Sequence, residues 1–258
     1  MRNPAKADKL LAMADAAGTS VELVALDVVD DASVLEGFSE VTARAGRVDV
    51  LINNAGIGYN STVEDLDIAR AQEVFETNYW GAIRCSQAVL PGMRERRSGH
   101  IVNISSIAGL VAAPAQLAYT SSKWAMECFS EHLAMEAAYY GIKVSIIEPG
   151  VTRTAILAKN VDVPADSEYN WIYGREFAFY TAGATANVAP EAVAQTIWTA
   201  LTATEPKLRY LVAWAAEELS SGRRVMTDEE WIALGAAATD AAYYDGFKAA
   251  FNLDIAPK

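Results

Sequence analysis

The chain has 258 residues, enough for one large α/β domain with a substantial core. Its formal net charge of −12 at pH 7 disfavours a nucleic-acid partner. The N-terminal MRNPAKADKL lacks the apolar core of a secretion signal, and the chain contains no run of about 18 apolar residues that would span a membrane. These features together predict a cytoplasmic protein.

Short runs rich in Val, Ile and Leu alternate with longer helical segments. The short runs are typical of buried strands and occupy 21–28, 48–56, 100–106, 142–150 and 208–214. The helical segments lie near 5–17, 31–45, 67–97, 118–140 and 188–203. This alternation predicts an α/β fold in which right-handed crossovers join the strands of a doubly wound parallel sheet.

Several residues predict where individual helices begin and end. Asp30 or Asp31 is a plausible N-cap for the second helix, and Gly46 fits just past its end. Thr227 and Glu230 have capping-box spacing and predict the start of a last helix. The intervening segment 152–188 has no strand signal, and its aromatic residues suit either a helical core or a mobile substrate lid. They are Tyr169, Trp171, Tyr173, Phe177, Phe179 and Tyr180.

The cysteines and histidines form no recognisable metal or catalytic motif. Cys85 and Cys128 lie in helical patterns and are expected to be buried free thiols, as in a reducing cytoplasm. His100 and His132 lack a motif partner and are interpreted as structural. The sequence therefore predicts no metal site.

Polar side chains follow two of the predicted strands. Asn53, Asn54 and Gly56 close one strand, and Ser105 and Ser106 close the next. The carboxyl ends of parallel strands share one edge of the sheet, where ligands bind.

Two further features lie in helical segments. Tyr119 and Lys123 stand four residues apart and so share one face of a helix. Asn78, a poor helix former, interrupts the long segment 67–97. Taken alone, Asn78 is equally well explained as a kink residue bonded to nearby backbone.

Together these residues resemble the short-chain dehydrogenase/reductase family. The motifs occur in the family's order and intervals up to about residue 155, and Ser106 is chosen over Ser105 because it lies thirteen residues before Tyr119. More weakly, 208–214 and the closing helix are similar to members that act on retinol- or steroid-like alcohols. The motifs are NNAG (53–56), Asn78, NISS (103–106), Tyr119-x-x-x-Lys123 and PGVTRT (149–154).

The resemblance implies hydride transfer between NADP(H), with NAD possible, and a secondary alcohol or ketone that is small and apolar. Tyr119 would be the general acid/base, helped by Lys123 and an oxidised nicotinamide, which lower the pKa of its phenol. Ser106 would orient the substrate oxygen, and Asn78 would hold a water in a proton relay. Lys123 would also bond the nicotinamide ribose. Cofactor contacts are expected at Asp27, Val28, Asn53, Asn54, Ala55, Gly56, Tyr119, Lys123, Pro149, Gly150, Thr152 and Thr154.

The chain departs from the family in one motif. The glycine-rich T-G-x-x-x-G-x-G turn that cradles pyrophosphate is missing, since Gly18 is the first glycine. The first two strands of the family's sheet are missing with it, so we expect a gap between 21–28 and 48–56 and a true start upstream of Met1. Arg2 would then lie where a basic residue favours NADP over NAD, and the alternative, preferred for the chain as given, is that Arg2 belongs to a disordered terminus.

We therefore expect one Rossmann-like domain over 1–258. Residues 1–155 would form the cofactor-binding and catalytic core, and 156–258 the substrate-binding and lid region. Apolar helices near 80–97 and 118–140 predict a homo-oligomer. The alternative is a cofactor-free relic of the family that acts as a binding or scaffold protein. An enzyme of another reaction type is disfavoured, because all four catalytic positions are present.

Overall fold

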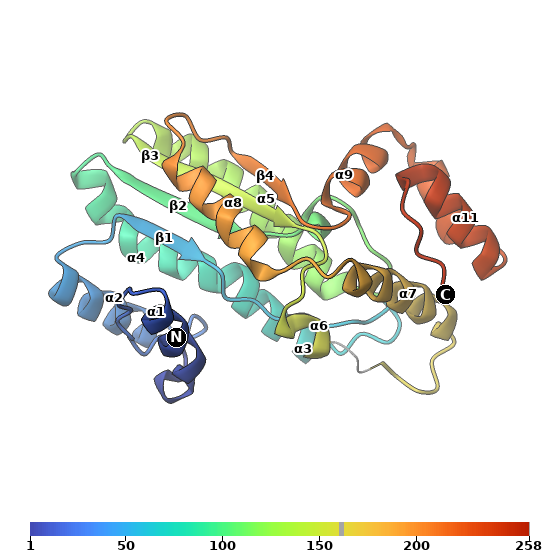
Figure 1. The fold of residues 1–258 in the computed structure, drawn as a ribbon, viewed down its shortest axis with the longest axis horizontal. Helices are drawn as coiled ribbons and strands as arrows, with labels where there is room; N and C mark the ends of the chain where they lie inside the picture. The colour runs from blue at the N-terminus through green and yellow to red at the C-terminus, as the bar shows by residue number, and fades with distance from the viewer. Residues whose placement is uncertain (160–162, 258) are drawn as a thin grey trace.

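The computed structural model describes residues 1–159 and 163–257, and a parallel sheet of four strands lies at its centre (Figure 1). The strand order is β1-β2-β3-β4, and every neighbouring pair is parallel. The strands are β1 (Val50–Asn53), β2 (Gly99–Ile104), β3 (Ile142–Pro149) and β4 (Arg209–Val212). Four of the five predicted strands are thereby confirmed.

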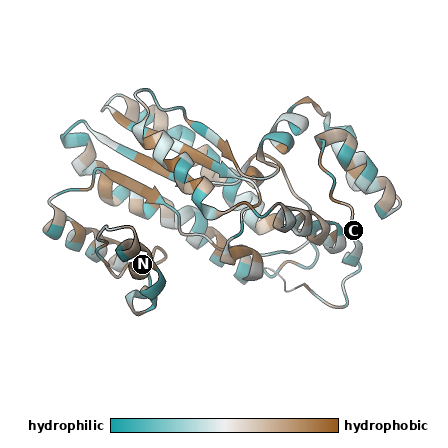
Figure 2. Ribbon diagram, viewed as in Figure 1, coloured by the Kyte–Doolittle hydropathy of each residue, from teal (hydrophilic) through white to brown (hydrophobic). Residues whose placement is uncertain are grey.

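Helices cover both faces of the sheet, as a doubly wound fold requires. One face packs against α2 (Asp31–Ala45), α4 (Gly81–Glu95) and α5 (Leu117–Ala138) through a core that includes Met93 and Ile101. On the other face, α8 (Pro190–Thr202) covers β3 and β4. The apolar sequence is concentrated on the strands and on the helix faces toward them (Figure 2).

The remaining elements flank this sandwich. Before the sheet lie η1 (Pro4–Lys6) and α1 (Asp8–Ala16). The long helical segment consists of α3 (Ile68–Phe75), a π-helical turn (Glu76–Trp80) and α4. Beyond the carboxyl ends of the strands lie η3 (Ile107–Gly109), α6 (Ala155–Lys159), α7 (Asn170–Ala186), α9 (Ala216–Val225), α10 (Asp228–Gly235) and α11 (Asp240–Phe251).

The helix-end predictions are confirmed. Asp30 accepts the Ser33 amide as N-cap of α2, and Gly46 follows that helix with φ of 80°. Thr227 and Glu230 form both bonds of a capping box at α10. The helix that they begin is not the last one, because it ends at Gly235 and α11 follows.

The prediction of a strand over 21–28 is wrong. This run is not part of the sheet, because a strand needs a hydrogen-bonded neighbour along its length. Its inter-segment backbone bonds are confined to Met1, whose amino group donates to Val24 O and whose carbonyl accepts from Leu26 N. Among the described residues no strand pairs with the outer edge of β1, and Val50 and Ile52 are 40% and 42% exposed.

The prediction that both cysteines are buried free thiols holds for one of them. Cys85 is a buried free thiol in α4, whereas Cys128 is exposed on α5 and contacts His132. His100 is buried beside the Ser145 hydroxyl, which agrees with a structural role. No described helix is long and apolar enough to cross a bilayer. Within 1–159 and 163–257, no three His, Cys, Asp or Glu side chains are grouped to hold a metal.

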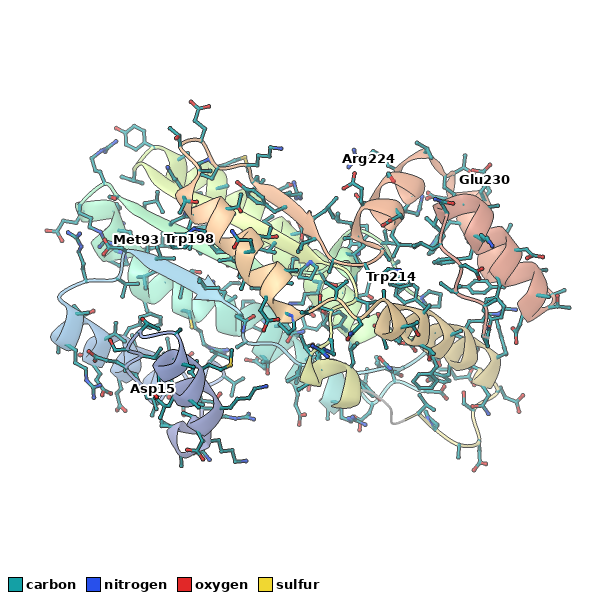
Figure 3. The ribbon with its side chains drawn as sticks, viewed as in Figure 1. Asp15, Met93, Trp198, Trp214, Arg224 and Glu230 are labelled. Carbon is teal, nitrogen blue, oxygen red and sulfur yellow. The ribbon has the colours of Figure 1, made fainter. Side chains whose placement is uncertain are left out.

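A close backbone approach at Gly150 joins the sheet to the C-terminal helices. The Gly150 amide donates to Val212 O, and a Cβ at Gly150 would lie 1.9 Å from the Trp214 carbonyl oxygen. Trp214 lies between the sheet edge and the C-terminal helices (Figure 3), and its indole packs on Phe179 of α7. Only glycine fits this crossing.

We predict that Gly150→Ala lowers the free energy of unfolding by about 1–3 kcal/mol, because the added methyl group must displace the backbone at Trp214. Gly174→Ala is the matched control, since Gly174 lies in α7 with nothing within 4 Å of its would-be Cβ. Alanine there should stabilise by up to about 1 kcal/mol through helix propensity. Urea denaturation measures both, and equal stability of the two variants would contradict the prediction.

Candidate active site

A cavity of about 1230 Å³ opens at the carboxyl ends of the strands, between the sheet edge and helices α6 to α11. Its wall is mainly apolar and includes residues from β1, β2, β3, α5, α7 and α8. Nine of the predicted site residues line it. They are Asn54, Gly56, Ser106, Tyr119, Lys123, Pro149, Gly150, Thr152 and Thr154.

Ser106 and Tyr119 meet because β2 and α5 both deliver residues to this edge. Ser106 follows β2 and caps η3, where its Oγ accepts the Ala108 amide at 3.1 Å. The same hydroxyl donates to Pro149 O at 3.3 Å and lies close enough to the Tyr119 phenol to oppose the effect of burial on the pKa of that phenol. Ser105 also lines the cavity, but its hydroxyl affects the pKa of Glu127, whereas the Ser106 hydroxyl affects the pKa of Tyr119.

Lys123 lies one helical turn after Tyr119 and is buried. Its Nζ donates to Ile104 O at 2.8 Å and lies 5.6 Å from the centre of the Tyr119 ring. The carbonyl that accepts this bond belongs to the last residue of β2, so the bond ties α5 to the sheet edge.

Asn78 lies in the π-helical turn and is fully buried behind the cavity. Its amide oxygen accepts the Ile57 amide at 2.8 Å, and its nitrogen donates to Ile57 O and to Ser122 Oγ. The Ser122 hydroxyl in turn donates to Tyr119 O. Asn78 is thus bonded to nearby backbone, and the same bonds fasten the loop after β1 to the helix that carries Tyr119.

The structure places four predicted cofactor residues away from the cavity wall. Asp27 and Val28 lie before α2, where the Asp27 amide bonds Ser33 Oγ. Asn53 is buried and donates to Ser86 and Asn103 inside the core. Ala55 is exposed but is not part of the wall. Sequence reasoning placed these four by motif alone, which does not fix the direction of a side chain.

Burial sets the protonation of the two central groups. It raises the pKa of the Tyr119 phenol, against a smaller lowering effect of the Ser106 hydrogen bond. It lowers the pKa of Lys123 to about 8, against the raising effect of the Glu127 carboxylate one turn further along α5. The pKa of Tyr119 is therefore not lowered in the protein alone. We expected Lys123 and an oxidised nicotinamide together to lower it, and in the protein alone burial prevails.

Sequence reasoning gave no role to three polar residues of the wall, which are Gln116, Arg175 and Glu176. It named Tyr180 only as part of an aromatic segment that suits either a core or a lid. Gln116 comes three residues before Tyr119, and its amide donates to the Tyr180 hydroxyl. Glu176 and Tyr180 come from α7, so one polar face of the aromatic segment reaches the cavity. The sequence held one signal for the residues of α7: Glu176, an acid, directly precedes the apolar run FAFY in REFAFY (175–180).

A parallel sheet with helices on both faces and a cavity at its carboxyl edge is the arrangement in which doubly wound α/β proteins bind their ligands. The short-chain dehydrogenase family model matches residues 1–164. The chain belongs to the short-chain dehydrogenase family, whose members are NAD(P)-dependent oxidoreductases that act on CH–OH groups.

Individual proteins to which the chain is similar agree with this family assignment. The chain is 38% identical over 221 residues to oxidoreductase BOA17 of Botryotinia fuckeliana, covering 83% of this chain and 80% of the relative. It is 43% identical to human retinol dehydrogenase 8 over 62% of this chain and 50% of the relative. A crystal structure of a short-chain dehydrogenase from Streptomyces avermitilis superposes with a TM-score of 0.77 at 33% identity, covering 92% and 87% of the chains.

We predict that Glu127→Gln lowers the Lys123 pKa below about 8, because the substitution removes the anion that favours the ammonium. Glu131→Gln is the control, since Glu131 also pairs with Arg209 but is not among the groups that shift the pKa of Lys123. The titration of 13Cε-labelled lysine, followed by NMR, measures both variants. An unchanged or raised pKa in Glu127→Gln would contradict the prediction.

Proposed function

We propose that this chain transfers a hydride between NADP(H) and a secondary alcohol or ketone. The observation that carries the proposal is the convergence of the Tyr119 phenol, the Ser106 hydroxyl and the Lys123 ammonium on one cavity at the carboxyl edge. A phenol held near a hydroxyl can move a proton to or from a substrate oxygen. Residues 1–155 would supply this machinery, and 156–258 would shape the substrate end.

The residues present fit the nicotinamide end of the cofactor. At Gly56 an added Cβ would lie 3.4 Å from Asn78 Oδ1 and 3.9 Å from Lys123 Nζ, so the missing side chain leaves room for a ligand against the backbone. Lys123 faces the same space and could bond ribose hydroxyls. Thr152 and Thr154 line the cavity beside it and would meet the carboxamide and phosphates.

In ketone reduction the bound cofactor would supply the hydride to the carbonyl carbon. Ser106 would donate a hydrogen bond to the carbonyl oxygen and hold it near the Tyr119 hydroxyl. Tyr119 would then give its proton to that oxygen as the C–O bond becomes a single bond. Burial keeps the phenol protonated before the reaction, which suits this direction. Lys123 would stabilise the phenolate that remains.

We propose an apolar substrate and a preference for NADP. The cavity wall supports the first, since Ile104, Val193 and Ile197 are part of it. The similarity to a retinol dehydrogenase points the same way. Arg2 supports the preference for NADP. It follows Met1, whose carbonyl accepts the Leu26 amide, and so lies close to the segment that leads to Asp27. A guanidinium there could pair with a 2′-phosphate.

We predict that Tyr119→Phe reduces ketone turnover to below about a hundredth, since general acid–base groups contribute ~10²–10⁴-fold and only the hydroxyl is lost. NADP affinity should stay almost unchanged. In Lys123→Met, turnover and NADP affinity should fall together, because the ammonium serves both. The assay is oxidation of millimolar NADPH, compared with NADH, over a panel of ketones, with cofactor binding followed by calorimetry. Millimolar cofactor keeps the assay sensitive to weak cofactor binding.

More than half of the activity left in Tyr119→Phe would show that Tyr119 only packs. The second candidate function is that of a cofactor-free binding protein. Undetectable binding of both cofactors at millimolar concentration, with no turnover, would support this second function and overturn the first.

We also propose a homo-oligomer. Exposed apolar side chains follow one stripe of α5 and its C-cap, namely Leu117, Trp124, Met135 and Tyr139. A stripe of this kind is typical of a helix that packs on a partner. Sedimentation at tens of micromolar should show a dimer or larger species, and Trp124→Lys should shift it toward monomer. A wild-type monomer at that concentration would contradict the proposal.

A further inference from the structure

Helix α7 turns one face toward the cavity, and this face carries two charged residues among apolar ones. The wall residues recur at helical spacing, so they share that face. They are Trp171, Ile172, Arg175, Glu176, Phe179 and Tyr180.

Arg175 is fully engaged with the C-terminal helices. Its Nε donates to Asp240 at 2.9 Å, and its other nitrogens donate to the Gly235 and Ala237 carbonyls. Its guanidinium also lies 4.6 Å from the centres of the Trp171 and Tyr243 rings. These contacts give Arg175 a structural role and leave the acid beside it unexplained.

Glu176 is 8% exposed, and neither carboxyl oxygen is hydrogen-bonded to a group among the described residues. The Gln116 amide is near enough to oppose the effect of burial without reaching bonding geometry, since it donates to Tyr180. Burial prevails and raises the pKa of Glu176 to about 9. At neutral pH the side chain is therefore a carboxylic acid with one O–H donor and an acceptor oxygen.

A buried polar group without a partner is costly, so such groups in native proteins usually serve a bond that the protein alone does not make. Glu176 belongs to the wall where the substrate must lie, and Tyr180 interacts electrostatically with both Glu176 and Tyr119. The unsatisfied acid and the proposed proton donor therefore border the same part of the cavity.

We propose that Glu176 determines specificity by binding a second hydroxyl group of the substrate, on a carbon other than the one that reacts. This inference rests on the proposed function and names its substrate class: a hydroxylated, otherwise apolar secondary alcohol or ketone. A neutral acid and a hydroxyl each have one donor and an acceptor, so the two can bond reciprocally. An ammonium would instead require the carboxylate, which burial disfavours.

The test measures ligand binding without turnover. The full chain is titrated with 2-alkanones of six to twelve carbons, with the same ketones bearing a terminal hydroxyl, and with those bearing a terminal amine. Trp171 and Trp231 line the cavity, so quenching of tryptophan fluorescence reports binding. The variants are Glu176→Gln, which keeps a neutral donor and acceptor, and Glu176→Leu, which removes both.

We expect the best hydroxyketone to bind the wild type about tenfold more tightly than its parent ketone. Glu176→Gln should retain this preference within about threefold, and Glu176→Leu should abolish it. No preference for the hydroxyl in the wild type would overturn the proposal, and so would a preference that survives in Glu176→Leu. Tighter binding of the amine, lost in Glu176→Gln, would identify a cation site instead.

These outcomes are independent of the proposed chemistry. If NADPH oxidation proves absent while the hydroxyl preference holds, the reaction is wrong and the binding site stands. If turnover depends on Tyr119 but Glu176 has no effect on the hydroxyl preference, the reaction stands and this inference fails. Should Glu176→Leu not fold, as judged by circular dichroism, Glu176→Ala takes its place, because it also removes the donor and the acceptor and should also abolish the preference.

Discussion

The hydrogen bond from Lys123 Nζ to the Ile104 carbonyl is the contact on which the site depends. A buried ammonium needs an acceptor, and the last residue of β2 provides one at 2.8 Å. The bond fixes α5 against the sheet edge, so Tyr119, one turn earlier, reaches Ser106 just beyond the same strand. The parallel arrangement of β2 and β3 brings Pro149 to the same place.

Burial and neighbouring charges have opposite effects on the pKa of the groups at this edge. Burial lowers the pKa of Lys123, and the Glu127 carboxylate opposes this shift, so that the pKa is about 8. Glu127 in turn pairs with Arg209, which also contacts the buried Glu148. Burial and the neighbouring Glu127 raise the pKa of Glu148 to about 8. Arg209 therefore holds Glu127, the acid that raises the pKa of Lys123, together with the buried Glu148.

Local signals allowed much of the fold to be predicted from the sequence. Asp30, Gly46 and the Thr227 capping box act within one helical turn, so the sequence alone reveals them. The motifs around Ser106 and Tyr119 were placed correctly because parallel strands share an edge.

The failures involve distant partners. The run 21–28 has the composition of a strand but no neighbour to bond, and composition does not report neighbours. The sequence does not reveal that Glu176 is buried in the cavity wall, because its polar neighbour there, Gln116, lies about sixty residues earlier. The direction in which Asn53 points was equally hidden, since its bonds run to Ser86 and Asn103.

The central claim is that hydride and proton transfer occur in the cavity at the carboxyl edge. The most direct measurement supplies NADPH deuterated at C4, as each of its two diastereomers, with a prochiral ketone, and analyses the product by mass spectrometry. The account predicts one deuterium on the carbinol carbon from a single diastereomer, and none in the same time with Tyr119→Phe. Alcohol formed without deuterium from either diastereomer, or no alcohol at all, would contradict it.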